Sequence, residues 1–492
     1  MTSIVIDKLG FAYGGGPELI KDLCLGLSTD WRLGLVGRNG SGKTTLLRIL
    51  AGDLPFSGTI SSKATMVYFP FGLPDPGAAG PGQLMGLFPG LRPWRLEEEA
   101  GLVGLAPETL ARPAGTLSPG ERTKLRLAAL FALDGVFPLI DEPTGGLDAA
   151  GREKVAAYLA GKGGFILVSH DRLLLETATD HILSFGRQGP ELHKGSFGSF
   201  WEERARRAKT EEELSRRLSG EMVRLSEAAG RATAWAGKTE RGKYGQGPVD
   251  RGFIGHKAAK AAKRAKAIAD RRQRAADAKG AMRFTAEMNL ALSMSPLAHR
   301  SRTLVEGRGL CLGYDGRAVL EGLDLVLEAG ERLAVRGANG SGKTLLMEFL
   351  AGAGGRLLSG NLRLAAGLSV SYVPQRAALG TGSIAGLCQG MGLDVSRVRT
   401  MLHYLGLGRE SLSSRLEDLS QGQARKVWLA LSLAREAHLY IWDEPLDFLD
   451  LHCRSQIEDL VLESGPSLIV VEHDLAFLGR VATRILDLGG LG

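Results

Sequence analysis

One loop motif occurs twice in the chain, about 300 residues apart. The first copy reads Gly37-Arg-Asn-Gly-Ser-Gly-Lys43-Thr44 and the second reads Gly337-Ala-Asn-Gly-Ser-Gly-Lys343-Thr344. Both fit G-x-x-x-x-G-K-[ST], in which backbone N–H groups and the N-terminus of the next helix bind phosphate. Each copy lies between an apolar strand and a helical run, at residues 33–36 and 46–50 and at residues 333–335 and 345–350. The repeat predicts two phosphate-binding loops in two similar α/β domains.

Three further features recur at nearly the same spacing. Ser118 and Ser420 are 302 residues apart, Asp141 and Asp443 are also 302 apart, and His170 and His473 are 303 apart. We therefore predict a first domain at 1–198, a linker at 199–300 and a second domain at 301–492.

Length and composition limit the class of protein. With 492 residues, 44% of them apolar, the chain can form several cores. It holds no apolar run of the roughly 18 residues that a membrane span needs, and its first nine residues do not resemble a secretion signal. Four widely spaced cysteines argue against an iron–sulfur cluster or a zinc ribbon and predict buried, reduced thiols. We expect a cytoplasmic globular protein.

A carboxylate pair follows an apolar strand in each domain. Asp141-Glu142 follows residues 136–140, and Asp443-Glu444 follows residues 439–442. Strand ends lie at the mouth of a parallel sheet, beside the phosphate loop. There the aspartate can hold Mg²⁺ together with Thr44 or Thr344, and the glutamate can polarise the attacking water.

A serine-glycine motif heads a helix in each domain. Leu117-Ser118-Pro-Gly120-Glu121 precedes residues 122–133, and Leu419-Ser420-Gln-Gly422-Gln423 precedes residues 424–435. Taken alone, each serine predicts only a helix cap. Together with the repeats, these stretches resemble the LSGGQ signature of the ABC ATPases. The resemblance implies that site one pairs Lys43 with Ser420 and that site two pairs Lys343 with Ser118.

The ABC resemblance also assigns roles to single residues. Tyr13 and Tyr314 match the aromatic residue that stacks on adenine, although either could instead be a core tyrosine. Gln375 matches the Q-loop, where the first copy has Phe71; residues 146–148 and 448–450 match D-loops. The implied catalytic residues are Glu142, Glu444, His170 and His473, and the implied Mg²⁺ ligands are Thr44, Asp141, Thr344, Gln375 and Asp443. The implied ATP-binding residues are Tyr13, Gly37, Asn39, Gly40, Gly42, Lys43, Thr44, Thr45, Ser118, Gly120, Tyr314, Gly337, Asn339, Gly340, Gly342, Lys343, Thr344, Ser420 and Gly422.

The linker carries the excess positive charge. Residues 199–300 hold 23 basic and 12 acidic residues, whereas the rest of the chain holds 38 and 42. A long helix is predicted at about 201–243, because Leu214, Leu218, Met222, Leu225, Ala229 and Ala232 recur at helical spacing. A second helix, rich in Ala and Lys/Arg, is predicted at about 256–279, and the tip at about 244–255 breaks the pattern. The simplest arrangement is an antiparallel helical hairpin.

The basic residues near the tip favour binding to a polyphosphate backbone, although such runs are often only solvated. The residues predicted to bind RNA are Arg251, Phe253, Ile254, His256, Lys257, Lys260, Lys263, Arg264 and Lys266. Phe253 and Ile254 either hold the hairpin together or project into a partner.

Tandem ABC domains around a basic helical linker resemble the ABC-F family of ribosome-associated ATPases. That resemblance implies ATP and Mg²⁺ as cofactors and the ribosome as partner, with the linker near 23S rRNA, the P-site tRNA and the peptidyl-transferase centre. Residues 250–260 and Trp442-Asp-Glu-Pro-Leu446 resemble the branch that protects ribosomes from lincosamides, streptogramin A and pleuromutilins. Lys43 and Ser118 are 75 residues apart and Lys343 and Ser420 are 77 apart, which leaves no room for an extra arm in the first domain; with the chain ending at the second domain, this favours the same branch.

Three other functions stay open at this stage. The chain could be an ABC-F translation factor without a role in resistance, the ATPase subunit of a membrane transporter, or a DNA-maintenance ATPase. A transporter would not need a basic insert of this length, and DNA-maintenance relatives normally add zinc motifs or a far longer coiled coil. We expect a monomer with intramolecular domain pairing and no membrane subunit.

Overall fold

The computed structural model describes residues 3–14, 16, 18–73, 75–186, 189–241, 260, 263, 266–271, 273–274, 292–314, 316–375 and 378–490. The chain forms two compact units. Residues 1–200 and 292–492 form one unit, and residues 201–291 form the other. The two repeats thus belong to one compact unit, and their predicted boundaries stay a prediction.

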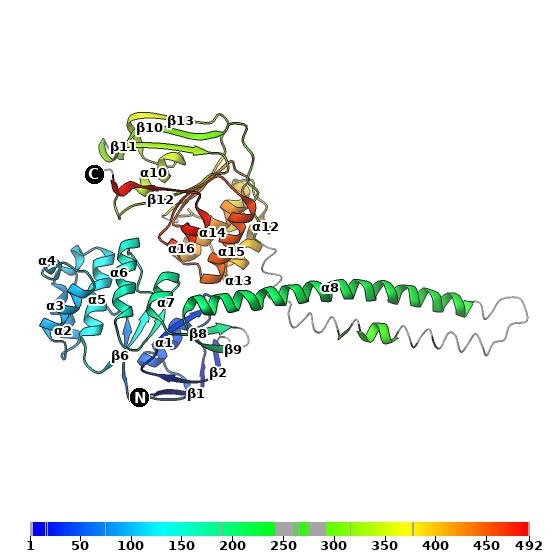
Figure 1. Ribbon diagram of the computed structural model, residues 1–492, viewed down its shortest axis with the longest axis horizontal. Helices are drawn as coiled ribbons and strands as arrows, with labels where there is room; N and C mark the ends of the chain where they lie inside the picture. Colours follow the sequence, from blue (N-terminus) through cyan, green and yellow to red (C-terminus); the bar gives the residue numbers. More distant parts are fainter. Residues whose placement is uncertain are drawn as a thin grey trace, which may run out of the picture. The chain divides into compact units, whose positions relative to one another are not determined.

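The first domain combines two sheets with seven α-helices among its described residues (Figure 1). The antiparallel sheet has the order β2 (Ile20–Ser28), β1 (Ser3–Phe11), β4 (Ser57–Ser61). The larger sheet has the order β5 (Thr65–Phe69), β6 (Val136–Asp141), β7 (Phe165–Val168), β3 (Arg32–Gly37), β8 (His181–Gly186), β9 (Gly189–Lys194), and only β9 runs antiparallel to its neighbour. The helices are α1 (Lys43–Ala51), α2 (Gly80–Leu87), α3 (Pro93–Leu102), α4 (Pro107–Leu110), α5 (Pro119–Ala132), α6 (Ala149–Ala160) and α7 (Arg172–Ala178).

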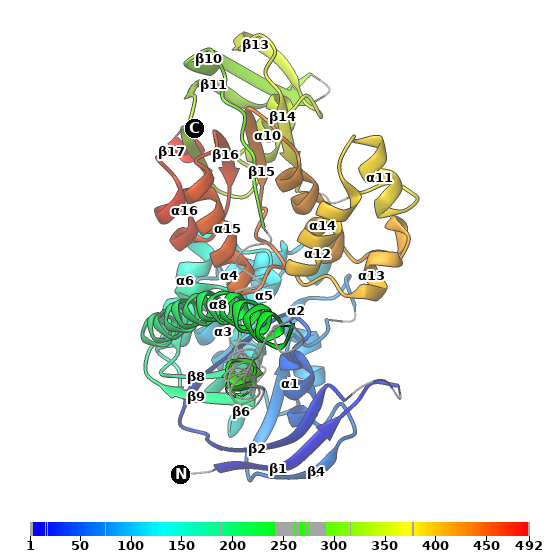
Figure 2. The same ribbon diagram turned by 90° about the vertical axis from the view of Figure 1, so that its right-hand side faces the viewer.

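The second domain repeats this plan. Its antiparallel sheet has the order β11 (Arg317–Glu328), β10 (Thr303–Tyr314), β13 (Arg356–Leu364). Its parallel sheet has the order β14 (Val370–Val373), β15 (Leu439–Asp443), β16 (Leu468–Val471), β12 (Arg332–Arg336), β17 (Arg484–Asp487). The helices are α10 (Lys343–Leu350), α11 (Ile384–Gly390), α12 (Val395–Tyr404), α13 (Arg409–Ser413), α14 (Gln421–Ala434), α15 (Leu451–Ser464) and α16 (Leu475–Val481). Figure 2 shows α11, α12 and α13 grouped beside α14 at one edge of this domain.

The central strands are apolar because both of their faces are covered. Every residue of β7, β15 and β16 is buried, as expected for parallel strands with helices or a second sheet on each side. In the second domain, one core cluster joins the antiparallel sheet to α10 and the parallel sheet. A second cluster joins α11, α12, α14 and α15 to the opposite face. The predicted combination of a parallel core with antiparallel and helical parts is confirmed.

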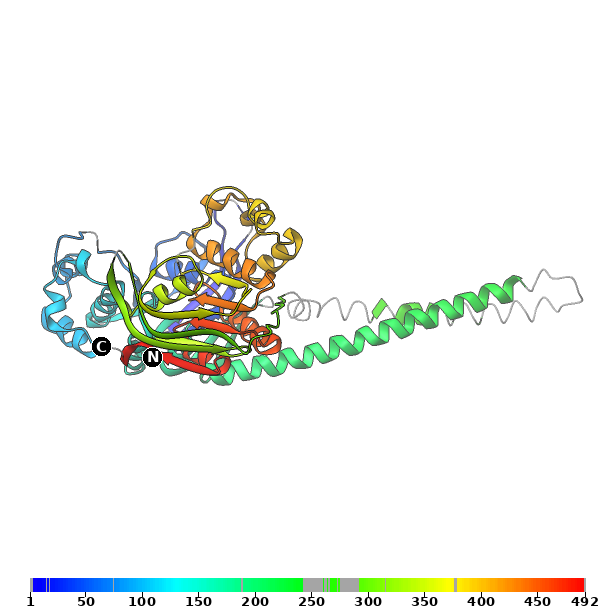
Figure 3. The ribbon, with the colours of Figure 1, turned by 90° about the horizontal axis from the view of Figure 1, so that it is seen from above.

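The second unit begins within a long helix, α8, that spans Phe197–Arg241 and that Figure 3 shows as one continuous rod. The helix predicted for about 201–243 is therefore confirmed. Within the predicted apolar stripe, Leu218, Met222 and Leu225 are partly buried, while Leu214 is exposed.

The second predicted helix of the linker, at about 256–279, is described only in part. Lys260, Lys263 and Lys266 are helical and exposed, as are most described residues up to 274. The predicted tip at 244–255, with Arg251, Phe253 and Ile254, lies outside the described residues, as do His256, Lys257 and Arg264.

Two expectations drawn from composition can be compared with the structure. Among the described residues, no helix is both long and apolar enough to cross a membrane. All four cysteines are free thiols, as predicted. The prediction that they are all buried is confirmed for Cys388 and Cys453, but it is wrong for Cys24, which is exposed on β2, and for Cys311, which is only partly buried.

Candidate active site

Each phosphate loop ends in a glycine whose backbone conformation only a residue without a side chain adopts easily. Gly42 and Gly342 have φ values of 91° and 88°, in the left-handed region, and each is the N-cap of the helix that starts at the next lysine. The loop can therefore turn its N–H groups toward the helix N-terminus, where α1 and α10 add their positive dipole ends.

The two loop lysines are held by their own loops. Lys43 Nζ donates to the carbonyl oxygens of Gly37 and Arg38, both at 2.9 Å. Lys343 Nζ donates to the equivalent carbonyls of residues 337 and 338 at 2.8 Å. Burial lowers the pKa of both lysines, and nearby carboxylates oppose part of that shift. Both ammonium groups are thus fixed inside the loops, where they can neutralise phosphate.

In the part of the chain that the structure describes, several buried polar atoms in and beside these loops have no hydrogen-bond partner. They include the hydroxyl oxygens of Ser41 and Ser341 and both carboxylate oxygens of Asp443. Buried polar groups are normally satisfied, so these atoms fit a site completed by a polyphosphate and a cation. Among the described residues, no cluster of three or more His, Cys, Asp or Glu could hold a metal ion. Mg²⁺, which retains water and phosphate ligands, suits such a sparse donor set.

Both loops line one cavity of about 1240 Å³. The predicted site residues that line it are Tyr13, Asn39, Gly40, Gly42, Lys43, Thr44, Thr45, Ser118, Asp141, Glu142, His170, Tyr314, Asn339, Gly340, Gly342, Lys343, Thr344, Gln375, Glu444 and His473. The predicted ATP-site residues that are not among those lining it are Gly37, Gly120, Gly337, Ser420, Gly422 and Asp443. Lys343, Lys43 and Ser118 all line this cavity, so the pairings of Lys343 with Ser118 and of Lys43 with Ser420 both stay predictions.

The two signature serines cap their helices as the motif predicts. Ser118 accepts from Glu121 N at 3.1 Å, and the Glu121 side chain accepts from Ser118 N at 2.7 Å. Ser420 and Gln423 form the same capping box. Each serine therefore sits at a helix N-terminus with its position fixed, as an anion-binding role would require.

The two tyrosines expected near adenine are not core residues. Tyr13 is 54% exposed and Tyr314 is 45% exposed. Their hydroxyls are anchored, Tyr13 to Thr45 at 3.1 Å and Tyr314 to Glu348 at 2.5 Å. The alternative that either is a core tyrosine is therefore wrong.

At site two, the predicted residues form a chain of hydrogen bonds. Thr344 Oγ1 donates to Gln375 Oε1 at 3.1 Å, and Gln375 Nε2 donates to Glu444 Oε1 at 2.9 Å. His473 Nε2 lies 3.3 Å from the same Glu444 oxygen. Burial alone would raise the pKa of Glu444, but the contacts with His473 and Gln375 hold it at about 2. Burial raises the pKa of neighbouring Asp443 to about 7.

Site one is built differently because Phe71 replaces the glutamine. The Phe71 ring packs edge-on against Phe69 and Phe88, with centroid separations of 6.3 and 5.0 Å. Beside Phe71, the Tyr68 hydroxyl donates a hydrogen bond to Asp141 Oδ2 at 3.0 Å. Sequence reasoning missed this contact, although the aromatic residues at 68, 69 and 71 were visible.

The glutamate of site one is held less closely than Glu444. Glu142 Oε1 lies 3.7 Å from His170 Nε2, and 41% of the Glu142 side chain is exposed to the cavity. Burial by the cavity walls, followed by repulsion from Asp141, raises the pKa of Glu142 to about 7. Burial and the charge of Lys43 lower the pKa of His170 to about 3, so this imidazole is neutral.

The glutamine of site two gives a test of the Mg²⁺ assignment. Gln375→Phe copies the residue of site one, and we expect it to raise the Mg²⁺ concentration for half-maximal ATP turnover about tenfold, since the variant has one oxygen donor fewer. A Mg²⁺ titration of the turnover rate measures this shift. Phe71→Ala is the matched control, because site one has no amide to lose. An unchanged titration of Gln375→Phe would remove Gln375 from the metal-binding residues.

Asn39 joins the first phosphate loop to the second domain. Its backbone N–H donates to Asp450 Oδ2 at 3.1 Å, and its Nδ2 donates to the Phe448 carbonyl at 2.7 Å. Its Oδ1 accepts from His170 Nε2 at 3.1 Å. The motifs predicted a role for Asn39 in ATP binding, whereas nothing in the sequence indicated this contact with the D-loop of the other domain.

The sequence resembles that of known ATP-binding proteins. The sequence pattern of the family described as ABC transporter matches residues 20–70 and 320–447. The ATP-binding protein Uup of Caulobacter vibrioides is 29% identical over 97% of this chain and 76% of its own length. The ribosome protection protein VmlR of Bacillus subtilis is 24% identical over 94% of this chain and 82% of its own. The energy-dependent translational throttle protein EttA of Mycobacterium tuberculosis is 26% identical over 96% and 89%.

The fold is similar to that of a solved archaeal ribosome recycling factor, crystallised with the archaeal ribosomal stalk protein aP1. The TM-score is 0.61 and the identity is 21%, over 93% of this chain and 83% of that one. Together with the family match and the ATP-binding relatives, this fold shows two ABC-type ATPase domains in an ATP-hydrolysing enzyme.

Proposed function

We propose that the chain is an ABC-F ATPase that acts on the ribosome. The observation that carries the proposal is the separate basic helical unit, residues 201–291, inserted between two ABC-type domains. The names of two relatives, a ribosome protection protein and a translational throttle protein, support a role in translation. A ribosome-bound ATPase of this kind would work as a cytoplasmic monomer with its two domains paired within one chain.

The charge distribution of the linker supports contact with RNA. The helix α8 is nearly balanced, with ten basic and eight acidic residues. Residues 242–300 hold thirteen basic and four acidic residues. Lys260, Lys263 and Lys266 are exposed and follow one another at helical spacing within the second predicted helix. Closely spaced exposed cations of this kind suit a phosphate backbone.

The finer proposal concerns where the linker acts. We infer that it reaches 23S rRNA near the P-site tRNA and the peptidyl-transferase centre, and that it relieves inhibition by a ribosome-targeting antibiotic. The 45 residues of α8 span about 68 Å at about 1.5 Å per residue. A helix of this length would allow the linker, with the predicted tip at 244–255, to reach far into a partner.

ATP hydrolysis would supply the cycle of binding and release. Lys43 and Lys343 would neutralise the phosphates, and Glu142 and Glu444 would orient the attacking water, with His170 and His473 beside them. Thr44, Asp141, Thr344, Gln375 and Asp443 would hold Mg²⁺, which neutralises phosphate charge when it is bound.

Two other functions predict different behaviour. An ABC-F translation factor without a role in resistance would bind ribosomes but leave drug sensitivity unchanged, and the name of EttA supports this alternative. A transporter subunit would fractionate with membranes. The basic linker favours the ribosome over the transporter, because a transport ATPase has no use for an RNA-binding arm.

Co-sedimentation with ribosomes tests the proposal. In ATP and moderate salt, we expect the protein to pellet with ribosomes and to be absent from washed membranes. Binding should weaken steeply as salt rises, because linker cations displace counterions from RNA. Replacing Lys260, Lys263 and Lys266 with Gln should lower the salt slope by up to about three, one for each lysine that pairs with a phosphate in the wild type.

A matched control uses three basic residues of α8. Arg216, Arg217 and Arg224 are exposed, and their replacement with Gln removes the same charge from a helix that is nearly balanced. The control should keep the original slope. Equal slopes for wild type and the Lys260, Lys263 and Lys266 variant would mean that those lysines are only solvated. Association of the protein with membranes would favour the transporter function over the ribosomal one.

A further inference from the structure

We propose that Arg172 and Glu458 are positioning residues that let helix α15 of the second domain hold the His170 loop of site one. The inference requires ATP hydrolysis by the paired domains but not ribosome binding. The inference can therefore fail while the proposed ribosomal function stands, and the ribosomal function can fail while the inference stands.

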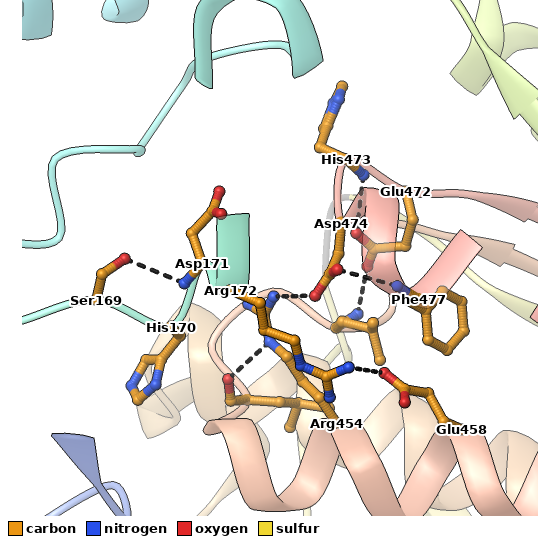
Figure 4. Close-up of polar contacts among 12 residues, drawn as sticks. Ser169, His170, Asp171, Arg172, Arg454, Glu458, Glu472, His473, Asp474 and Phe477 are labelled. Carbon is orange, nitrogen blue, oxygen red and sulfur yellow. Dashed lines mark hydrogen bonds and ion pairs between the residues drawn. The ribbon is translucent and has the colours of Figure 1, made fainter. Parts of the chain in front are cut away.

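Arg172 and Glu458 form an ion pair across the two domains. Arg172 Nη1 lies 2.6 Å from Glu458 Oε1, and Figure 4 shows the two side chains pointing toward one another. The Glu458 side chain is fully buried and the Arg172 side chain is 13% exposed. A buried ion pair depends on both partners, because removing one leaves an uncompensated charge.

The pair is the last of a series of contacts that starts on α15, passes through site one and comes back to α15. Asp450 caps the start of α15 and also accepts from Asn39 of the first phosphate loop. Asn39 in turn accepts from His170. Two residues after His170, Arg172 returns to α15 at Glu458. One helix of the second domain thus holds the His170 segment through Asn39 on one side and through Arg172 on the other.

Among the described residues, the equivalent path at site two lacks both its ion pair and its contact between the phosphate loop and the D-loop. Glu458 lies eight residues after Asp450, and the residue eight after Asp148 is Ala156. Arg172 lies two residues after His170, and the residue two after His473 is Leu475. Alanine and leucine cannot form an ion pair. In the described part of the chain, Asn339 also has no hydrogen bond to Asp148 that would match the bond of Asn39 to Asp450.

A neighbouring pair shows that this difference is not a general loss of symmetry. Arg454, one turn before Glu458, pairs with Asp474 at 3.1 Å within the second domain (Figure 4). The first domain repeats this contact as Arg152 with Asp171 at 3.4 Å. Each domain therefore has its own arginine–aspartate pair, whereas the arginine–glutamate pair between the domains is present at site one and not at the equivalent described positions of site two.

The arrangement couples the position of His170 in site one to the position of α15 in the second domain. Any movement of α15 away from the first domain must release Arg172 or pull the loop that carries His170. We expect this contact to affect the rate of hydrolysis rather than ATP affinity, because neither residue lines the cavity.

A double-mutant cycle in the full-length protein tests the proposal. Arg172→Leu and Glu458→Ala install the residues found at the equivalent positions of site two. Each should lower kcat about threefold to tenfold with little change in KM, and the double variant should be no slower than either single variant. Arg172→Lys should recover part of the rate. Effects that multiply in the double variant, or a kcat that does not change, would overturn the inference.

Arg480 provides the matched control. It is the second guanidinium on Glu458, with Nη1 2.9 Å from Oε2, but it belongs to the same domain. Arg480→Leu should lower the melting temperature while kcat stays near wild type. If Arg480→Leu and Arg172→Leu slow kcat equally, neutralisation of Glu458 would be the cause and the link between domains would be excluded. Melting temperatures and binding of a fluorescent ATP analogue identify variants that fail to fold.

Discussion

Replacing Glu142 and Glu444 together with Gln is expected to abolish ATP turnover while ATP still binds. Gln has the shape of Glu but cannot polarise the attacking water, and loss of such a group typically costs about 100-fold or more in rate. The phosphate loops are unchanged, because Lys43 and Lys343 are held by their own loop carbonyls. A steady-state phosphate-release assay measures turnover, and stabilisation of the protein by ATP measures binding.

The control for this experiment is a second pair of Glu→Gln changes. Glu153 on α6 and Glu463 on α15 are exposed, one in each domain, and do not line the cavity. Their double replacement should leave turnover near wild type. If the proposed function is right, the Glu142 and Glu444 variant should also accumulate on ribosomes, because ATP binds and is not hydrolysed. Near-normal hydrolysis would remove both glutamates from the proposed role.

The local parts of the site could be predicted because short motifs determine them. The glycines before Lys43 and Lys343 require left-handed turns, and helices α1 and α10 begin where the motif places them. Ser118 and Ser420 cap their helices for the same kind of local reason, a side-chain oxygen three residues before a free N–H. Strands β7 and β16 follow from short apolar runs buried on both faces.

The contacts between the domains could not be predicted in this way. Arg172 and Glu458 are separated by 286 residues. No local sequence pattern indicates that the arginine two residues after His170 contacts a residue on α15. Comparing the repeats does give a retrospective signal, because Leu475 and Ala156 occupy the equivalent positions. The position of Phe71 among aromatic rings also depends on packing with Phe88, seventeen residues away.

Replacing the predicted tip residues should abolish drug protection while ATP turnover stays intact. The changes are Arg251→Ala, Phe253→Ala and Ile254→Gly. These residues belong to the unit at 201–291, and all residues that line the ATP cavity belong to the other unit. The expected result is therefore a loss of function that separates the tip from the ATPase. Growth in the presence of a lincosamide, a streptogramin A or a pleuromutilin, compared with purified ATPase activity, measures both.

A control triple variant removes the same kinds of side chain from α8. Leu214 and Val223 are 40% and 60% exposed, and Arg224 is exposed, so Leu214→Ala, Val223→Ala and Arg224→Ala delete two apolar groups and one cation. Circular dichroism separates two roles for Phe253 and Ile254. If they hold a hairpin together, their loss should reduce helicity, whereas if they project into the ribosome, helicity and ribosome binding should stay near wild type. Unchanged protection in the tip variant would contradict an action of the tip near the drug site, because only the tip residues were removed.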